Sequence, residues 1–255
     1  MWHDLWLVFR REFGLSVRNP TWLGIQLMQP VLYLTLFGPL MEKMVANTPG
    51  FPPGDVWTIF TPALIVMVAL FGTSFVGFGL LAEYRNGVIE RLRVTPVSRV
   101  ALLLGKVFTN ALQTLVQACV LILLAMLVFG LRAPVGGVLL SLVIAALLAV
   151  TMASSSYALA LTLKNEQAFP ALLNSVMLPV LLLSGILIPI TSGLAPDWLY
   201  TLSRINPFSH VVEAERASFR GEITLDALLT GSVVLVVLTG LAVWWGTRTF
   251  RRESA

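Results

Sequence analysis

Six apolar runs, each long enough to cross a bilayer, constrain this 255-residue chain more than any other feature. A membrane-crossing helix needs about 20 predominantly apolar residues. The chain is 57% hydrophobic and only 12% charged, which leaves too little polar surface to cover a water-soluble globule of this size. The sequence therefore predicts an all-α polytopic membrane protein, a single transmembrane domain over residues 1–255. The six expected transmembrane helices are residues 22–41, 57–81, 107–129, 136–163, 168–190 and 225–246.

The positions of the basic residues predict which side of the membrane each loop occupies. Lys and Arg concentrate in cytoplasmic loops. Twelve of the seventeen basic residues fall in the N-terminus, the loop between the second and third runs, the 164–167 turn and the C-terminus. Because six spans place both chain ends on one side, we expect the N- and C-termini in the cytoplasm.

The first twenty residues form an element of their own. On a helix, one face collects aromatic and apolar side chains and the opposite face collects charged ones. This pattern predicts an amphipathic helix that lies in the cytoplasmic interface and contacts membrane lipid. A contact with a partner subunit is the alternative. The apolar face is Trp2, Leu5, Trp6, Phe9 and Phe13, and the charged face is Asp4, Arg11 and Arg18.

No ionisable residue lies well inside any of the six runs, because Lys106 and Asp226 stand at their ends. Ion-coupled transporters usually need such groups to bind or relay the coupling ion. Both histidines, His3 and His210, lie outside the runs, so a Ser–His catalytic site inside the bilayer is excluded. One cysteine, Cys119, supports neither a disulfide nor a metal cluster. We expect no catalytic residue and no metal site.

The chain also lacks a nucleotide site of its own. Gly105-Lys106 matches the end of a phosphate-binding loop, but that loop needs Gly five residues earlier and Ser or Thr next. Val100 and Val107 occupy those positions. We expect no cofactor bound by this chain and no nucleic-acid partner.

The polar loop 83–106 separates the second and third runs. Glu83, Gly87 and Glu90 follow helical spacing, which predicts a short amphipathic helix. Thr95 and Pro96 suit the N-cap and first position of the next helix, so we expect a corner there. A solvated loop whose charges only fix the topology is the alternative.

Two blocks of this sequence resemble one family. The first is Glu83-x-x-x-Gly87-x-x-Glu90-x-Leu92-x-x-Thr95-Pro96-Val97-x-Arg99, followed by Gly105-Lys106. It resembles the cytoplasmic loop of ABC transporter type-2 permeases, whose coupling helix docks onto an ATPase subunit. The second block resembles that family's segment between the fifth and sixth spans. It comprises Leu183-Ser184-Gly185-Ile186-Leu187-Ile188-Pro189, Pro196-x-Trp198-Leu199, Asn206-Pro207-Phe208 and Glu213-Ala214-x-Arg216.

The resemblance implies short re-entrant helices in an extracellular segment, residues 191–224, for which a plain loop is the alternative. It also implies a half-transporter of the bacterial cell membrane. Two copies of the chain would form the pathway, and two separate ATPase subunits would bind ATP and Mg. The residues expected to carry the ATPase coupling are Glu83, Arg85, Gly87, Glu90 and Arg91.

Candidate pathway residues lie on the second and fifth spans, which line the pathway at the dimer axis in the permeases that this chain resembles. Flexible methionines and flat aromatic rings suit an amphipathic or aromatic substrate. Ordinary helix packing is the alternative for each side chain. The candidates are Met67, Phe71 and Phe75, with Phe78 on the same face, and Asn174, Met177 and Leu181.

Polar side chains also form stripes on two other spans. Small and polar residues commonly hold membrane helices together. We expect that role for Asn110, Gln113 and Gln117 on the third span, and for Thr151, Ser154, Ser155 and Thr162 on the fourth.

The function expected from the residues and the resemblance is an ATP-driven exporter permease. It is closest to the branch associated with resistance to drugs and antibiotics, and would move hydrophobic, amphipathic or lipid-like molecules. Export of lipid-linked polysaccharide is a second transport hypothesis. A membrane scaffold that recruits a cytoplasmic protein without transport is a third.

Overall fold

The computed structural model describes residues 2–18, 20–45, 55–87, 98–221 and 225–253. Within these ranges every regular element is helical, which confirms the all-α prediction. The elements are α1 (Trp2–Val17), α2 (Pro20–Leu32), the π-helix η1 (Tyr33–Phe37), α3 (Gly38–Val45), α4 (Val56–Ser74), α5 (Gly77–Arg85), α7 (Arg99–Phe129), α8 (Val135–Leu163), α9 (Ala168–Leu183), α10 (Asp197–Ile205), α11 (Pro207–Arg220) and α12 (Leu225–Glu253).

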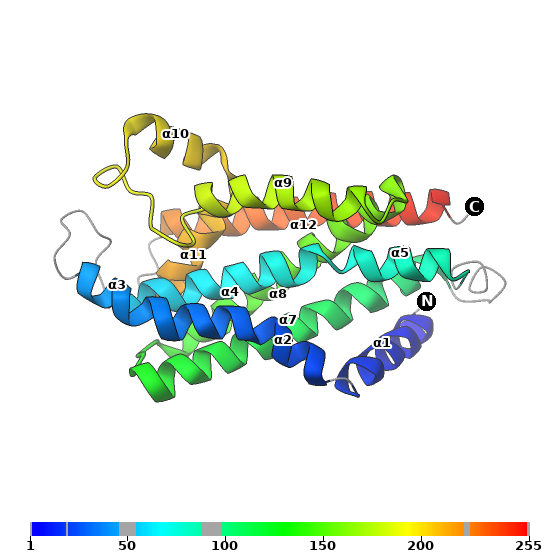
Figure 1. The fold of residues 1–255 in the computed structure, drawn as a ribbon, viewed down its shortest axis with the longest axis horizontal. Coiled ribbons are helices and arrows are strands. Elements are labelled where there is room, and N and C mark those ends of the chain that lie inside the picture. Colours follow the sequence, from blue (N-terminus) through cyan, green and yellow to red (C-terminus); the bar gives the residue numbers. More distant parts are fainter. Residues whose placement is uncertain (1, 19, 46–54, 88–97, 222–224, 254–255) are drawn as a thin grey trace.

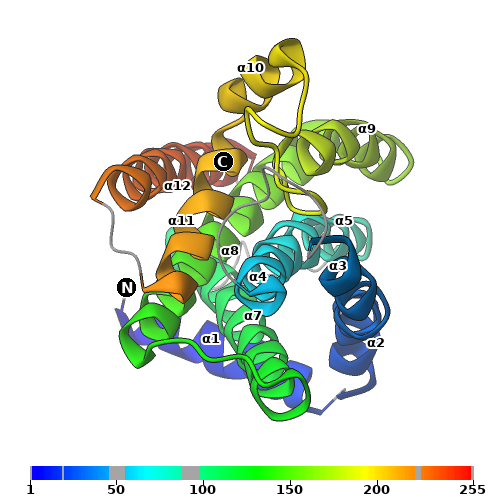
Figure 2. The same cartoon turned by 90° about the vertical axis from the view of Figure 1, so that its left-hand side faces the viewer.

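The long helices lie side by side along the longest axis of the molecule (Figure 1). Helix α8 occupies the centre of the bundle and packs against α12, α7, α4, α11 and α5 (Figure 2). Small side chains make this packing close, because a Cβ added at Gly246 of α12 would lie only 3.1 Å from the carbonyl oxygen of Ser154 on α8. Large apolar side chains on the outer faces of α7, α8, α9 and α12 are exposed, as expected for surfaces that meet lipid.

Four helical segments are long and apolar enough to cross a membrane: Val56–Arg85, Val100–Phe129, Val135–Leu163 and Leu228–Arg252. The chain is thus a multi-pass membrane protein. The predicted first span corresponds to α2, η1 and α3, which follow one another without a gap. The predicted fifth span, 168–190, is helical only as far as Leu183, so α9 is an apolar helix shorter than spanning length. The count of six spans remains a prediction.

The second predicted span is not one unbroken helix, because the backbone leaves helical geometry at Phe75, between α4 and α5. Ser156 of α8 stabilises this break. Its hydroxyl accepts the N–H of Gly77 at 2.9 Å and donates to the carbonyl of Ser74 at 2.5 Å. A Cβ at Gly77 would lie 2.5 Å from the Ser156 carbonyl oxygen, so glycine allows the close approach of α5 and α8.

Helix α7 begins at Arg99, eight residues before the predicted start of the third span. Its N-cap is Ser98, whose side chain accepts the N–H of Ala101 at 3.2 Å. The cap of α7 is therefore a serine three residues after the predicted Thr95, and its hydroxyl satisfies one of the free N–H groups of the first turn. Thr95 and Pro96 lie outside the described residues.

The described parts of the segments that the basic residues predicted to be cytoplasmic lie at one end of the bundle. Figure 1 shows both chain termini, the end of α5 and the turn between α8 and α9 at this end. Helix α10 lies at the opposite end. We call the first of these the terminal end of the bundle.

Candidate functional site

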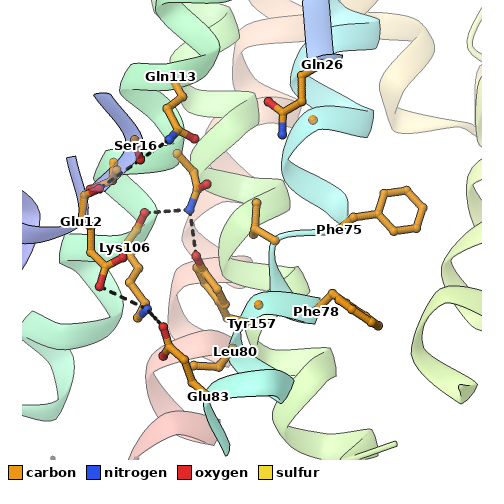
Figure 3. A pocket seen from close by; sticks show the side chains of 15 residues that line it. Glu12, Ser16, Gln26, Phe75, Phe78, Leu80, Glu83, Lys106, Gln113 and Tyr157 are labelled. Carbon is orange, nitrogen blue, oxygen red and sulfur yellow. Dashed lines mark hydrogen bonds and ion pairs between the residues drawn. The ribbon is translucent and has the colours of Figure 1, made fainter. Parts of the chain in front are cut away.

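One buried lysine joins three helices at the terminal end of the bundle. Lys106 lies seven residues into α7 and is only 7% exposed. Its ammonium group donates to Glu83 Oε1 of α5 at 2.6 Å and lies 3.4 Å from Glu12 Oε1 of α1 (Figure 3). A buried charge needs such partners to offset its desolvation. Lys106 therefore connects three helices that are far apart in the sequence.

Glycine brings α1 close enough for this contact. A Cβ added at Gly105, next to Lys106, would lie 2.7 Å from Cγ1 of Val8 on α1. Any larger residue would push α1 away from α7. The stacked rings of Phe9 and Phe13, with centroids 5.8 Å apart, continue the predicted aromatic face of α1.

Helix α5 is also connected to the turn between α8 and α9. Arg85 donates to the Glu166 carboxylate at 2.5 Å, and the Lys164 ammonium lies 5.6 Å from the centroid of the Tyr84 ring. Arg85 is 69% exposed, so this ion pair is largely solvated and stabilises less than the Lys106 contacts do.

Gly87 ends α5 rather than continuing it. Its φ is +67°, the left-handed region that favours glycine, and its N–H bonds to the carbonyl of Tyr84 at 3.2 Å. The prediction that Glu83 and Gly87 share a helical face is therefore wrong, because the helix stops at Arg85. Glu83, Arg85 and Gly87 still lie together at the terminal end. Glu90 and Arg91 lie outside the described residues, and the coupling role of all five stays a prediction.

The polar stripe on α7 joins three neighbouring helices. Asn110 Nδ2 donates to the Tyr157 hydroxyl of α8 at 2.8 Å. Gln113 Nε2 donates to the Ser16 hydroxyl of α1, and Gln117 Nε2 donates to Gln26 Oε1 of α2, both at 2.6 Å. On α8, Thr151 and Thr239 of α12 share a hydrogen bond of 2.8 Å. These contacts confirm the helix-joining role for Asn110, Gln113, Gln117 and Thr151. The prediction is wrong for Thr162, which donates to the carbonyl of Ala158 in its own helix, and the Ser154 hydroxyl has no hydrogen-bond partner among the described residues.

The candidate pathway residues lie in three different environments within this chain. Met67 and Met177 are buried in the main core, with Phe71 and Leu181 packed against it. The Ser74 hydroxyl contacts Met177 Sδ at 3.6 Å, which ties α4 to α9. Phe75 packs on a separate cluster around Phe169, and Asn174 is exposed on α9. Whether they meet a substrate stays a prediction.

The second resembling block forms a packed corner at the opposite end. Asn206 caps α11 by accepting the N–H of Phe208 at 3.1 Å, and its Nδ2 donates to the carbonyl of Val180 on α9. Arg216 donates from Nε to the carbonyl of Ile59 at 3.1 Å and from Nη2 to the carbonyl of Gly185 at 2.7 Å. It therefore joins α4, α11 and the segment after α9.

Two adjacent ionisable groups are buried in α11. Arg216 is 6% exposed, and burial lowers its pKa to about 10, so it stays charged at neutral pH. Glu215 is fully buried, and neither of its carboxyl oxygens has a hydrogen bond of normal geometry among the described residues, although the Ser141 hydroxyl of α8 lies near enough to act on the carboxyl group. Burial raises the pKa of Glu215 well above its ordinary value, while the Ser141 hydroxyl opposes the shift.

The sequence did not reveal which residues contact Lys106, or that Ser156 stabilises a break between α4 and α5. From the sequence, Lys106 was recognisable only as a basic residue at the end of a predicted span. Its partner Glu83 lies 23 positions earlier in the sequence. Glu12 and Tyr157 carried no recognisable spacing. The only signal available was the choice of Lys, Glu and Asn at the membrane-proximal ends of predicted helices.

A family model described as ABC-2 type transporter matches residues 3–219, a range that includes both resembling blocks. The chain belongs to the ABC-2 type transporter family. It is a transport permease subunit, and membership implies a partner ATPase subunit.

Curated relatives of this ABC-2 family member bear permease names. A putative transport permease of Cyanophora paradoxa is 26% identical over 84% of this chain and 73% of its own length. A probable multidrug ABC transporter permease of Escherichia coli is 27% identical over 84% of this chain and 58% of its own. A probable doxorubicin resistance ABC transporter permease of Mycobacterium tuberculosis is 25% identical over 72% of this chain and 62% of its own.

Proposed function

We propose that this chain is the membrane-spanning subunit of an ABC exporter that moves hydrophobic or amphipathic molecules out of a bacterial cell. A separate ATPase subunit, which binds ATP and Mg, supplies the energy. The names of the multidrug and doxorubicin resistance relatives support this substrate class. Both termini lie in the cytoplasm, six helices cross the membrane, and α10 and α11 form the re-entrant segment.

The joint at the terminal end of the bundle carries the proposal. The ten residues 88–97 connect α5 to α7, and the Lys106–Glu83 ion pair joins the two helices beside that connection. Glu12 adds α1 to this unit, and the Arg85–Glu166 pair links it to α9. An ATPase docked on residues 83–97 therefore acts on four helices at once.

ATP can drive a movement through this joint only if it binds one conformation of the transporter more tightly than the other. A ligand shifts an equilibrium between two conformations by its difference in affinity for them. Closure of the ATPase pair would move the segment around Gly87, Glu90 and Arg91. The ion pairs of Lys106 and Arg85 would then carry the displacement to α1, α7 and α9.

A second copy of the chain completes the pathway in this proposal. Helix α9 packs against α8, α4 and α10 through only part of its surface. Its outer face is apolar and exposed, and it carries Leu172, Val176, Leu178 and Leu182. A partner copy along α9 would bring the exposed Asn174 to the pathway. The other candidates, Met67, Phe71, Phe75, Met177 and Leu181, pack inside this chain and would reach the pathway only if the surrounding helices moved apart.

The test uses the chain reconstituted in lipid with its ATPase subunit. Amphipathic drugs should stimulate ATP hydrolysis and accumulate on the far side of the membrane. Glu90→Arg or Gly87→Trp should abolish both effects, whereas Arg252→Glu, an exposed charge reversal at the end of α12, should abolish neither.

Other outcomes would contradict the proposal. A stable complex without any stimulated ATP hydrolysis would favour a scaffold. Stimulation only by lipid-linked polysaccharide would favour that export function. Normal export by the Glu90→Arg and Gly87→Trp variants would show that the coupling residues lie elsewhere.

A further inference from the structure

A pocket of about 580 Å³ lies between α1, α2, α5 and α7, beside the Lys106 cluster. One wall is the polar face of α7, with Lys106, Asn110 and Gln113. The opposite wall is a stripe of residues from α4, the break and α5. It consists of Gly72, Val76, Gly79 and Glu83.

Two glycines keep this pocket open. A Cβ added at Gly79 would meet no atom within 4 Å, and one at Gly72 would meet only Gln117 Oε1 at 3.6 Å. Glycine at either position is therefore not required by helix packing. The absence of two side chains instead leaves space along the stripe, and Gly79 is exposed, so the pocket opens to the surface there.

The pocket has an excess of negative charge. Its lining contains two carboxylates, Glu12 and Glu83, and one ammonium group, Lys106. Lys106 engages only one oxygen of Glu83, and the other oxygen, Oε2, is buried without a hydrogen-bond partner among the described residues. An unpaired carboxylate oxygen in a partly buried site favours a cation.

The pocket is also elongated and apolar along one side. Gly72 on α4 and Glu83 near the end of α5 stand at the two ends of the glycine-bearing wall. Val76 and Leu80 line this wall, and Figure 3 shows Phe75 and Phe78 on the side opposite the charged groups. Charge therefore gathers at one end of the pocket, nearest the chain termini, and apolar surface extends away from it.

We propose that this pocket binds an amphipathic organic cation, with its positive charge beside Glu83 and Glu12 and its apolar body along the Gly72–Gly79 stripe. The site lies within one chain and shares Phe75 with the candidate pathway residues, whereas the exposed face of α9 does not line it. Such a ligand would define the substrate class of the proposed exporter. Binding itself does not depend on the proposed export function, and only the transport of the bound cation rests on it. An anion of the same shape would be repelled by the second carboxylate.

The test compares tetraphenylphosphonium with tetraphenylborate, which have nearly the same shape and opposite charge. Binding of each ion to the purified full chain in a neutral detergent is measured by equilibrium dialysis, without the ATPase. We expect one saturable cation site per chain and at least about tenfold weaker binding of the anion, the change expected when one unit charge is reversed at close range.

Three variants locate the site. Gly79→Leu fills the pocket and should weaken cation binding at least about tenfold, and Glu12→Gln should weaken it about fivefold. Gly240→Leu is the matched control, since a Cβ on this exposed glycine of α12 also meets no atom within 4 Å, and it should leave binding unchanged. If the Gly79→Leu chain does not fold, cation binding by the Glu12→Gln variant decides whether the cation occupies this pocket.

Equal affinity for both ions, or unchanged cation binding in Gly79→Leu and Glu12→Gln, would overturn the proposal. Because binding is measured without ATPase, such a result would leave the export function intact. Conversely, saturable cation binding without any coupled ATP hydrolysis would support the site and count against the export function.

Discussion

Lys106 and Arg216 are the two most buried basic side chains in the part of the chain that the structure describes, and they are satisfied in different ways. Lys106, at the terminal end, contacts carboxylates on two other helices. Arg216, at the opposite end, contacts two backbone carbonyls. Both tie together segments that are distant in sequence.

The difference matters because a side-chain partner can change its rotamer or its charge, whereas a carbonyl is fixed by the helix or turn that contains it. Lys106 can therefore exchange partners when α1, α5 and α7 move. Arg216, whose planar guanidinium spans two fixed acceptors, holds α4 and the end of α9 at a constant separation. We infer that the terminal end is the adaptable end of the bundle and that the Arg216 corner is the rigid one.

The largest expected change in stability comes from a substitution in the rigid end. Arg216→Met removes both hydrogen bonds and should lower the free energy of unfolding by about 3 kcal/mol. Thermal unfolding of the purified chain measures this. Arg216→Lys should restore less than half of the loss, because an ammonium on a flexible stem does not reproduce the two-carbonyl geometry. Full restoration by lysine would contradict the rigid-anchor interpretation.

A smaller loss is expected at the adaptable end. Lys106→Met leaves Glu83 and Glu12 without their shared cation and should cost about 2 kcal/mol. Adding Glu83→Gln in the same chain should recover at least half of the loss, because the uncompensated carboxylate is removed. The double-mutant cycle, measured by thermal unfolding, reports the coupling directly. Additive losses would mean that the ion pair contributes nothing.

Glu215, the residue next to Arg216, gives a prediction for how stability depends on pH. Because burial raises the pKa of Glu215, the native state binds more protons than the unfolded state above the ordinary pKa of 4.5. Stability should therefore fall as the pH rises from that value toward the raised pKa. Glu215→Gln should remove the decline and stabilise the chain by about 1 kcal/mol near neutral pH.

The Ser141 hydroxyl supplies the matched comparison for the pH measurement. It opposes the upward shift of the Glu215 pKa, so Ser141→Ala should raise this pKa further and extend the decline of stability to a higher pH. A flat pH profile in the unsubstituted chain would show that the Glu215 carboxylate has a partner.

The smallest effect is expected for the solvated ion pair at the terminal end. Glu166→Gln removes the partner of Arg85, which is 69% exposed, and should change stability by no more than about 0.5 kcal/mol. If the pair transmits motion to α9, the variant should instead lower drug-stimulated ATP hydrolysis in the reconstituted complex. A loss of stability comparable to that of Lys106→Met would contradict the contrast between buried and solvated pairs.

Much of the fold was predictable because apolar runs of spanning length can fold only as helices in a bilayer, whose backbone groups bond internally. The polar stripe of Asn110, Gln113 and Gln117 was also interpreted correctly. The break between α4 and α5 was not predictable, since it depends on a hydroxyl of Ser156 that is 79 positions away from Gly77. The end of α5 at Arg85 likewise depends on Gly87 adopting a left-handed conformation rather than a helical one.

The sequence by itself determined the class of protein, its all-helical fold class and the family, because hydrophobic length and short motifs are local properties. Only the tertiary structure decided that Lys106 binds Glu83 and Glu12, that Arg216 donates to Ile59 and Gly185, and that Gly72 and Gly79 border a charged pocket. These contacts depend on which helix faces which. Side-chain packing in three dimensions selects that arrangement, and no local pattern in the chain encodes it.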